Sequence, residues 1–165
     1  MSAVQGAFYY MAAASIASAL LAVTRRNPVH SMLWVLALFL HVAGIFLVAG
    51  AEFLAAVQVI VYAGAILVFY LFFLMLLDLP SEVAGPRFGA HWPLCALAGI
   101  LFAALAFLQA PEKEGIITGG PATGNLSAVG TALFRQFVLP FEILSLILLA
   151  AMVGAVVVAK RRTGP

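Results

Sequence analysis

Charged residues are scarce in this sequence of 165 residues, which has 8 lysines and arginines and 6 aspartates and glutamates, together 8% of the chain. Soluble domains are typically about 25% charged and about 45–50% apolar, whereas 65% of this chain is apolar. So few charges cannot cover the surface of a water-soluble domain, and the mean hydropathy of +1.18 agrees. The composition excludes a soluble protein and indicates an integral membrane protein.

Cysteine is almost absent as well. Cys95 is the only one, which excludes a disulfide within the chain and any iron–sulfur or cysteine-based zinc site that this chain would build alone. The phosphate-binding glycine loops, nucleophile elbows and haem motifs of soluble enzymes are missing too. The pI near 9.0 does not indicate nucleic acid, because the basic residues stand at the ends of apolar segments. We therefore expect no nucleic-acid partner, no metal and no redox chemistry in this chain alone.

Long uncharged runs predict an all-α integral membrane protein with five transmembrane helices in a single domain over residues 1–165. A helix needs about 20 largely apolar residues to cross a bilayer. Breaking the chain at its charges gives five such segments, approximately residues 3–24, 30–50, 53–77, 89–109 and 138–159.

A sixth uncharged run, residues 115–134, is rich in glycine and small polar residues. We interpret it as part of an outer loop over residues 110–137. Within this loop Asn125 is a candidate cap for a short helix lying at the membrane surface. The apolar face of that helix would carry Leu126, Val129, Leu133 and Phe137.

The distribution of lysine and arginine predicts that the N-terminus is outside and the C-terminus inside. Basic residues gather in the loops on the inner side of a membrane. With the N-terminus outside, Lys113 and Arg135 lie outside, and six basic residues lie inside: Arg25, Arg26, Arg87, Lys160, Arg161 and Arg162. The first segment lacks a basic start, so we interpret it as a retained helix and not as a cleaved signal peptide.

Polar residues within the apolar runs are functional candidates, because each of them costs free energy in a bilayer. Glu142 follows Pro140 inside the last run. It is either a protonatable group facing a bundle interior or a carboxylate that reaches the surface. Glu52 stands in the tight turn before the third segment, where solvation is expected. His41, near the middle of the second run, fits a neutral hydrogen-bonded histidine better than a proton relay or a ligand.

The third segment contains two further candidates and a patch of small residues. Gln58 and Tyr62 are four residues apart and are expected to share one helix face. An amide such as Gln58 can carry a hydrogen-bonded chain of water but cannot hold a transported proton, and an interhelical hydrogen bond is the alternative. Glycine inside a helix costs about 1 kcal/mol relative to alanine. Gly64 therefore indicates either close helix packing or a local distortion such as a π-bulge.

The third segment also carries a family resemblance. Its core, Val59-Ile60-Val61-Tyr62-Ala63-Gly64-Ala65-Ile66, closely resembles the signature of the J subunit of bacterial NADH:quinone oxidoreductase (complex I), whose mitochondrial counterpart is subunit 6. Two further stretches are similar to that family: Asn27-Pro28-Val29-His30 before the second helix and Leu139-Pro140-Phe141-Glu142 at the start of the fifth. The match spans most of the chain from Asn27 to Lys160.

The resemblance implies a non-redox membrane-arm subunit that helps to couple quinone reduction to proton translocation. In that family the third helix is similar to a switch, whose middle adopts a π-bulge and whose α/π interconversion opens or closes a water path. On this sequence Tyr62 and Gly64 would be the bulge and the hinge, within the deforming segment 59–66. The proton path would include Glu142, Tyr62, Gln58 and Glu52. Some relatives carry a carboxylate where Gln58 stands, and His41 matches no family pattern.

The resemblance further implies partners and a location. This chain would bind no cofactor, while the complex would use NADH, FMN, iron–sulfur clusters and quinone. Its neighbours would be the quinone-site subunit, the small K and A subunits and an antiporter-like subunit, in the inner (plasma) membrane of a bacterium. Related ferredoxin- or deazaflavin-linked complexes share this membrane arm, so NADH is the donor by analogy. A purely structural scaffold of the same complex and a freestanding small transporter are the alternative functions.

Overall fold

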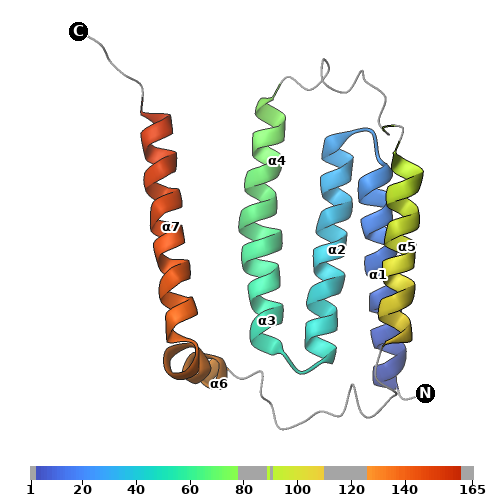
Figure 1. The fold of residues 1–165 in the computed structure, drawn as a ribbon, viewed down its shortest axis with the longest axis horizontal. Helices are drawn as coiled ribbons and strands as arrows, with labels where there is room; N and C mark the ends of the chain where they lie inside the picture. Colours follow the sequence, from blue (N-terminus) through green and yellow to red (C-terminus); the bar gives the residue numbers. More distant parts are fainter. Residues whose placement is uncertain (1–2, 78–88, 90, 110–125, 161–165) are drawn as a thin grey trace. The chain divides into compact units, whose positions relative to one another are not determined.

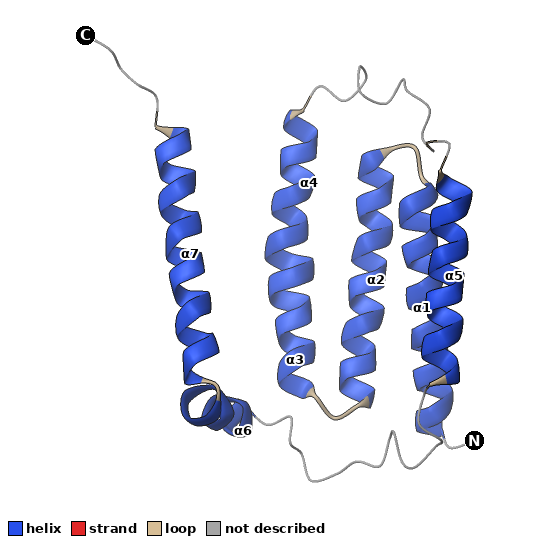
Figure 2. Cartoon of the chain, in the orientation of Figure 1, coloured by secondary structure: helices blue, strands red, loops and turns tan. Residues whose placement is uncertain are grey.

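A computed structural model describes residues 3–77, 89, 91–109 and 126–160, and the regular structure within these ranges is helical throughout (Figures 1 and 2). The all-α class is therefore confirmed for the described residues. The helices are α1 (Ala3–Thr24), α2 (Pro28–Val48), α3 (Glu52–Val57), η1 (Gln58–Ile66), α4 (Leu67–Leu76), α5 (Trp92–Leu108), α6 (Leu126–Thr131), η3 (Ala132–Gln136) and α7 (Val138–Ala159). The contacts divide the chain into two units, Met1–Ala122 and Thr123–Pro165.

Four helical stretches are long and apolar enough to cross a membrane: Ala3–Thr24, Pro28–Val48, Glu52–Leu76 and Val138–Ala159. At a rise of about 1.5 Å per residue, even the shortest of them, with 21 residues, exceeds a hydrocarbon core of about 30 Å. The length and composition of these helices make the chain a multi-pass membrane protein.

The fourth predicted span, residues 89–109, is shorter in the structure. It is represented by α5, which has 17 residues, or about 26 Å of helix. The count of five spans therefore stays a prediction. The orientation also stays a prediction, because four of the basic residues on which it depends lie outside the described residues: Arg87, Lys113, Arg161 and Arg162.

Helices α1 and α2 form an antiparallel pair in which small residues face the partner helix (Figure 1). Ser15 and Ser18 of α1 and Ala43 of α2 are buried. The Met11 side chain lies over Gly44, where an added Cβ would come within 2.9 Å of the methionine sulfur. The Ser15 hydroxyl donates to the Met11 carbonyl at 2.8 Å, so this buried polar group is satisfied within its own helix.

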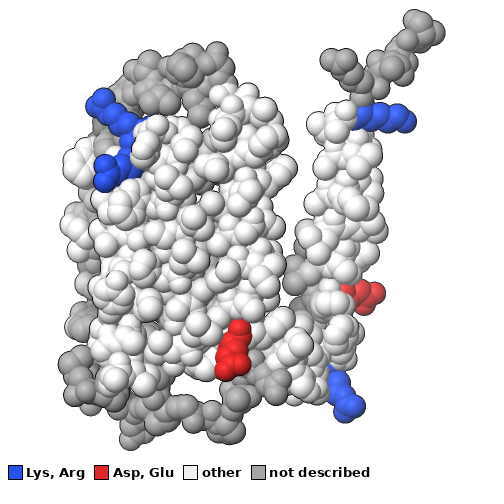
Figure 3. All heavy atoms as spheres, turned by 180° about the vertical axis from the view of Figure 1, so that it is seen from behind, with Lys and Arg blue, Asp and Glu red and all other residues white. Residues whose placement is uncertain are grey.

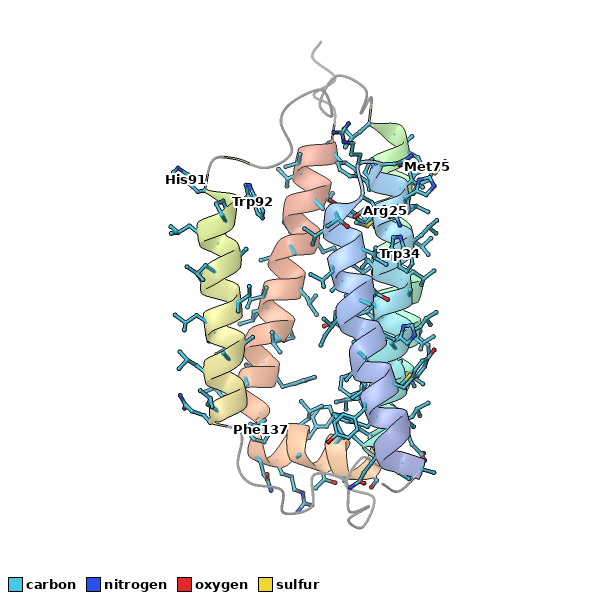
Figure 4. All side chains as sticks on the ribbon, turned by 90° about the vertical axis from the view of Figure 1, so that its right-hand side faces the viewer. Arg25, Trp34, Met75, His91, Trp92 and Phe137 are labelled. Carbon is cyan, nitrogen blue, oxygen red and sulfur yellow. The ribbon has the colours of Figure 1, made fainter. Side chains whose placement is uncertain are left out.

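The turn between α1 and α2 gathers the features that start the second helix. The Asn27 side chain accepts a hydrogen bond from the Val29 N–H at 2.9 Å, and Pro28 stands at the first helical position. Both are favoured there, because the first N–H groups of a helix have no partner within the helix. The Arg25 guanidinium lies 5.8 Å from the centre of the Trp34 ring (Figure 4), within the range of a cation–π contact.

A glycine turn connects α2 to α3. Gly50 has φ of +75°, a left-handed conformation that strains residues with a Cβ. Its N–H donates to the Leu47 carbonyl at 3.0 Å, and the Ala51 N–H donates to the Phe46 carbonyl at 2.8 Å. These two bonds define a Schellman motif, which satisfies the last carbonyls of α2. The motif leaves a very short connection, so the start of α3 is held against the end of α2.

The second unit consists of α6, η3 and α7. The chain bends at Phe137, whose φ of −118° and ψ of 35° are not helical. The Phe134 and Phe141 rings meet across the bend, with centroids 4.9 Å apart and planes at 63°. The short helix predicted in the outer loop is present over residues 126–136, but it ends before Phe137, so the predicted apolar face is incomplete. Its predicted cap, Asn125, and the rest of segment 110–125 lie outside the described residues.

Charged side chains of the described residues stand near the ends of the helices, and the lengths between them are apolar (Figure 3). Such a distribution keeps ionised groups near water and out of the hydrocarbon core. Glu142, which lies one turn into α7, is the described charge that departs most from this pattern.

Replacement of Gly50 by alanine should destabilise the α2–α3 turn by about 1–2 kcal/mol, because the left-handed conformation brings a Cβ too close to the backbone. The measurement is the temperature at which the chain aggregates in detergent-solubilised membranes. Gly6→Ala is the control, because Gly6 lies in α1 with open space around it and alanine is the better helix former. An unchanged or raised temperature for Gly50→Ala would contradict the strain assigned to this position.

Candidate functional site in the third helix

The third helix changes its hydrogen-bond pattern in the middle. Segments α3 and α4 are α-helical, and the nine residues of η1 between them are π-helical. At the end of η1 the Leu67 N–H donates to the Tyr62 carbonyl, five residues earlier. The segment singled out from the sequence, residues 59–66, lies within η1. Because π turns are rare and are frequent at functional sites, η1 is the candidate functional segment.

The buried positions of the third helix show the effect of η1. These positions are Ala55, Gln58, Ala63, Leu67 and Leu74. Residues on one face of an α-helix recur every three or four positions, but the step from Gln58 to Ala63 is five. Thus η1 contains one more residue than an α-helix would use for this step. The extra residue turns α4 by about 100° relative to an uninterrupted α-helix.

Gln58 and Tyr62 differ in burial in this conformation. Gln58 is 9% exposed, whereas Tyr62 is 46% exposed. The expectation that the two side chains share a helix face stays a prediction. The Tyr62 ring lies beside α2, edge-on to the Phe39 ring, with centroids 5.9 Å apart and planes at 76°.

Phe39 is a member of the site that the sequence analysis missed. A phenylalanine in an apolar helix carries no signal of its own, because side chains of this type are common in every membrane helix. Only the structure, which brings α2 beside η1, shows that the Phe39 ring meets Tyr62.

Gly64 stands on the exposed side of η1. A Cβ added to it would lie 3.3 Å from the carbonyl oxygen of Val59, five residues earlier. This separation is tighter than usual for a Cβ, so a side chain at this position would press on the carbonyl one π turn before it. The glycine therefore suits the π geometry.

Glu52 is the first residue of α3 and is exposed. A carboxylate in the first turn interacts favourably with the helix dipole. The Schellman turn holds this residue at one end of the unit, close in sequence to η1 but separated from Tyr62 by more than two helical turns.

Glu142 is exposed on α7, two residues after Pro140. Proline in the first turn of a helix is well tolerated, since its missing N–H would have no helical acceptor. The Ser145 hydroxyl donates to the main-chain carbonyl of Glu142 at 2.7 Å, which leaves the carboxylate itself out of this bond. Glu142 belongs to the second unit and is described here by itself.

His41 of α2 is half-buried and faces α1. Its Nδ1 lies 2.6 Å from the Ala37 carbonyl oxygen, and because a carbonyl can only accept, Nδ1 carries a proton. The ring also meets Tyr10 edge-on, with centroids 6.4 Å apart. This geometry agrees with the interpretation of a hydrogen-bonded histidine.

The described side chains offer chemistry for protons and water. Over residues 3–77, 89, 91–109 and 126–160, no group of three histidine, cysteine, aspartate or glutamate residues could hold a metal ion. Groups that can bind or pass protons in and near the apolar helices include Glu52, Gln58, Tyr62 and Glu142 together with His41.

Comparison with known proteins gives one consistent family. A family model described as NADH-ubiquinone/plastoquinone oxidoreductase chain 6 matches residues 18–158. The chain is 32% identical to NADH-quinone oxidoreductase subunit J of Rhodobacter capsulatus, over 94% of this chain and 81% of that protein. It is 36% identical to subunit J of Pseudomonas aeruginosa, over 90% and 92% of the two chains. It is also 36% identical to NAD(P)H-quinone oxidoreductase chain 6 of Leptolyngbya boryana, over 96% and 80%.

Replacement of Ala63 by leucine should push η1 away from α2, because Ala63 is 5% exposed and overpacking costs about 1–3 kcal/mol. Ala65→Leu is the matched control, since Ala65 is exposed on the same segment. We expect a lower aggregation temperature in detergent-solubilised membranes for Ala63→Leu than for Ala65→Leu. Equal temperatures for the two variants would contradict the assignment of Ala63 to the packed face.

Proposed function

Because the chain belongs to the chain 6 (subunit J) family of NADH-quinone oxidoreductases, we propose that it is the non-redox membrane subunit through which quinone reduction is coupled to proton translocation. The observation that carries the proposal is the π-helical segment η1 in the middle of the third helix. A helix that holds one extra residue has a second conformation available, in which that residue is lost from the bulge and the helix beyond it turns.

The mechanism is a change of register in the third helix. In the π conformation the residues packed beyond the bulge are Ala63, Leu67 and Leu74. In a continuous α-helix each would be replaced by the residue before it, so that Tyr62, Ile66 and Phe73 face the same way. The aromatic side chains of α4 turn with the helix and can block or free a path for water. Such a two-state element is what coupling between distant sites requires.

The proton path would use the polar groups on either side of this switch. Carboxylates such as Glu52 and Glu142 can hold a proton. Gln58 and the Tyr62 hydroxyl can only pass one along a chain of hydrogen bonds. A change in the exposure of Gln58 or Tyr62 would therefore make or break a water chain without moving any carboxylate.

The topology, membrane, partner subunits and cofactors that we propose follow from the family. We propose five membrane spans with the N-terminus outside, in the inner (plasma) membrane of a bacterium. The partners would be the quinone-site subunit, the small K and A subunits and an antiporter-like subunit. NADH, FMN, iron–sulfur clusters and quinone would be bound elsewhere in the complex. This chain would supply no redox group of its own.

A scaffold role in the same complex is the second candidate, and the surface of α7 favours it. The described residues of this helix, Val138–Ala159, are all exposed in the isolated chain. In a membrane such a helix is covered by lipid or by neighbouring subunits, whose packing need not involve any switch.

The variant Gly64→Val separates the two candidates. A β-branched side chain beside the Val59 carbonyl should disturb η1, and a shift of about 1.4 kcal/mol between two conformations changes their ratio roughly tenfold. We expect quinone-linked NADH oxidation to fall several-fold more than NADH oxidation with an artificial acceptor. Gly99→Val is the control, because an added Cβ there would meet nothing within 4 Å. Equal loss of both activities would count against the coupling role, and loss of assembly would favour the scaffold.

The variant Glu142→Gln tests the proton path. The amide has the same shape, and the carboxylate is exposed, so assembly should be spared. In mildly solubilised membranes the chain should migrate with a very large quinone-reducing assembly in both wild type and variant. The number of protons translocated per electron should fall in the variant, and Ser145→Ala, one turn away, should leave it unchanged. An unchanged proton yield in Glu142→Gln would remove this residue from the path, and a wild-type chain that migrates alone would favour a freestanding transporter.

A further inference from the structure

The start of the third helix is fixed, so a change of register must act on its later part. The Schellman turn at Gly50 joins α3 to α2 with two backbone hydrogen bonds, and Ala55 is buried soon after the turn. The residues before η1 therefore have little freedom to rotate. If η1 became α-helical, the rotation of about 100° would fall on residues 62 onward.

That rotation would bring Tyr62 into the position that Ala63 now occupies. Ala63 is 5% exposed, so a phenol ring would be more crowded there than a methyl group is. In the π register the Tyr62 ring lies beside the position of Ala63 and is 46% exposed. The two registers thus differ in where the Tyr62 ring lies, and any side chain that holds the ring in its present place favours the π register.

Phe39 is the side chain that contacts the Tyr62 ring in its present place. Its ring meets the Tyr62 ring with centroids 5.9 Å apart and planes at 76°, the edge-to-face geometry that aromatic pairs favour. Phe39 belongs to α2, which the Gly50 turn keeps in place beside the third helix. The contact therefore joins the bulge to a fixed neighbour.

We propose that Phe39 is a positioning residue that holds the third helix in its π register by stacking edge-to-face with Tyr62. Its relevance to proton translocation rests on the proposed function, whereas its effect on the register does not. Loss of an edge-to-face pair should raise the ratio of α to π conformers about 2- to 10-fold.

The test uses the assembled complex with variants of Phe39. Phe39→Ala removes the ring, and Phe39→Leu keeps apolar bulk without an aromatic edge and serves if the alanine variant assembles poorly. Phe39→Tyr keeps the ring. Leu40→Ala is the matched control, since Leu40 is the next residue of α2 and is 49% exposed.

Two measurements report the register. The first is electron cryo-microscopy of the complex, in which the density over residues 58–76 distinguishes a π from an α register. The second is labelling by a membrane-permeant maleimide of single cysteines at Leu74, which is 8% exposed, or at Phe73, which is 47% exposed. A Cys95→Ala background removes the chain's only native cysteine. Labelling at position 74 relative to position 73 should rise as the α register becomes populated.

The outcomes are distinct. We expect the labelling ratio to rise about 2- to 10-fold in Phe39→Ala and Phe39→Leu, with α-register particles enriched, and to stay at the wild-type value in Phe39→Tyr and Leu40→Ala. No change in either measurement for Phe39→Ala and Phe39→Leu would overturn the proposal, as would an equal rise in Leu40→Ala. A shifted register with unchanged proton yield would uphold the role of Phe39 and instead contradict the coupling function.

Discussion

The contact between the third helix and α2, made largely through small side chains, constrains the rest of the first unit. The left-handed turn at Gly50 brings the two helices together, and the alanines at positions 55 and 63 are among the least exposed residues of the chain. Gln58 and Ala63 are both buried in this unit, and the step of five residues between them is not one that an α-helix makes along one face. The π segment makes this step, and within it the Tyr62 ring contacts Phe39 of α2.

The π segment η1 is in contact with a neighbouring helix, α2. A π turn has less favourable hydrogen bonds than an α turn and survives where side-chain packing compensates. Here the compensation comes from the buried Ala63 methyl and from the Tyr62 ring on Phe39.

Elsewhere in the described residues, two polar groups within helices are satisfied locally. Ser15 and His41 bond to carbonyls one turn earlier in their own helices, as polar groups in a bilayer must find partners within the protein. The chain has little interior of its own, since no large side chain among the described residues is fully buried. In lipid, apolar surface gives no drive for helices to associate.

The amino-acid sequence by itself determined the helical membrane class of the protein and its family. Uncharged runs of about 20 residues have few alternatives to membrane helices, and the signature over residues 59–66 identified both the family and the segment with unusual geometry. The tertiary structure decided which side chains are buried. Gln58 and Tyr62 are four residues apart, yet Gln58 is 9% exposed and Tyr62 is 46% exposed, a difference that the spacing alone does not record. The role of Phe39 was equally hidden, because a contact between two helices depends on how they pack, and the pattern of either helix alone does not record it.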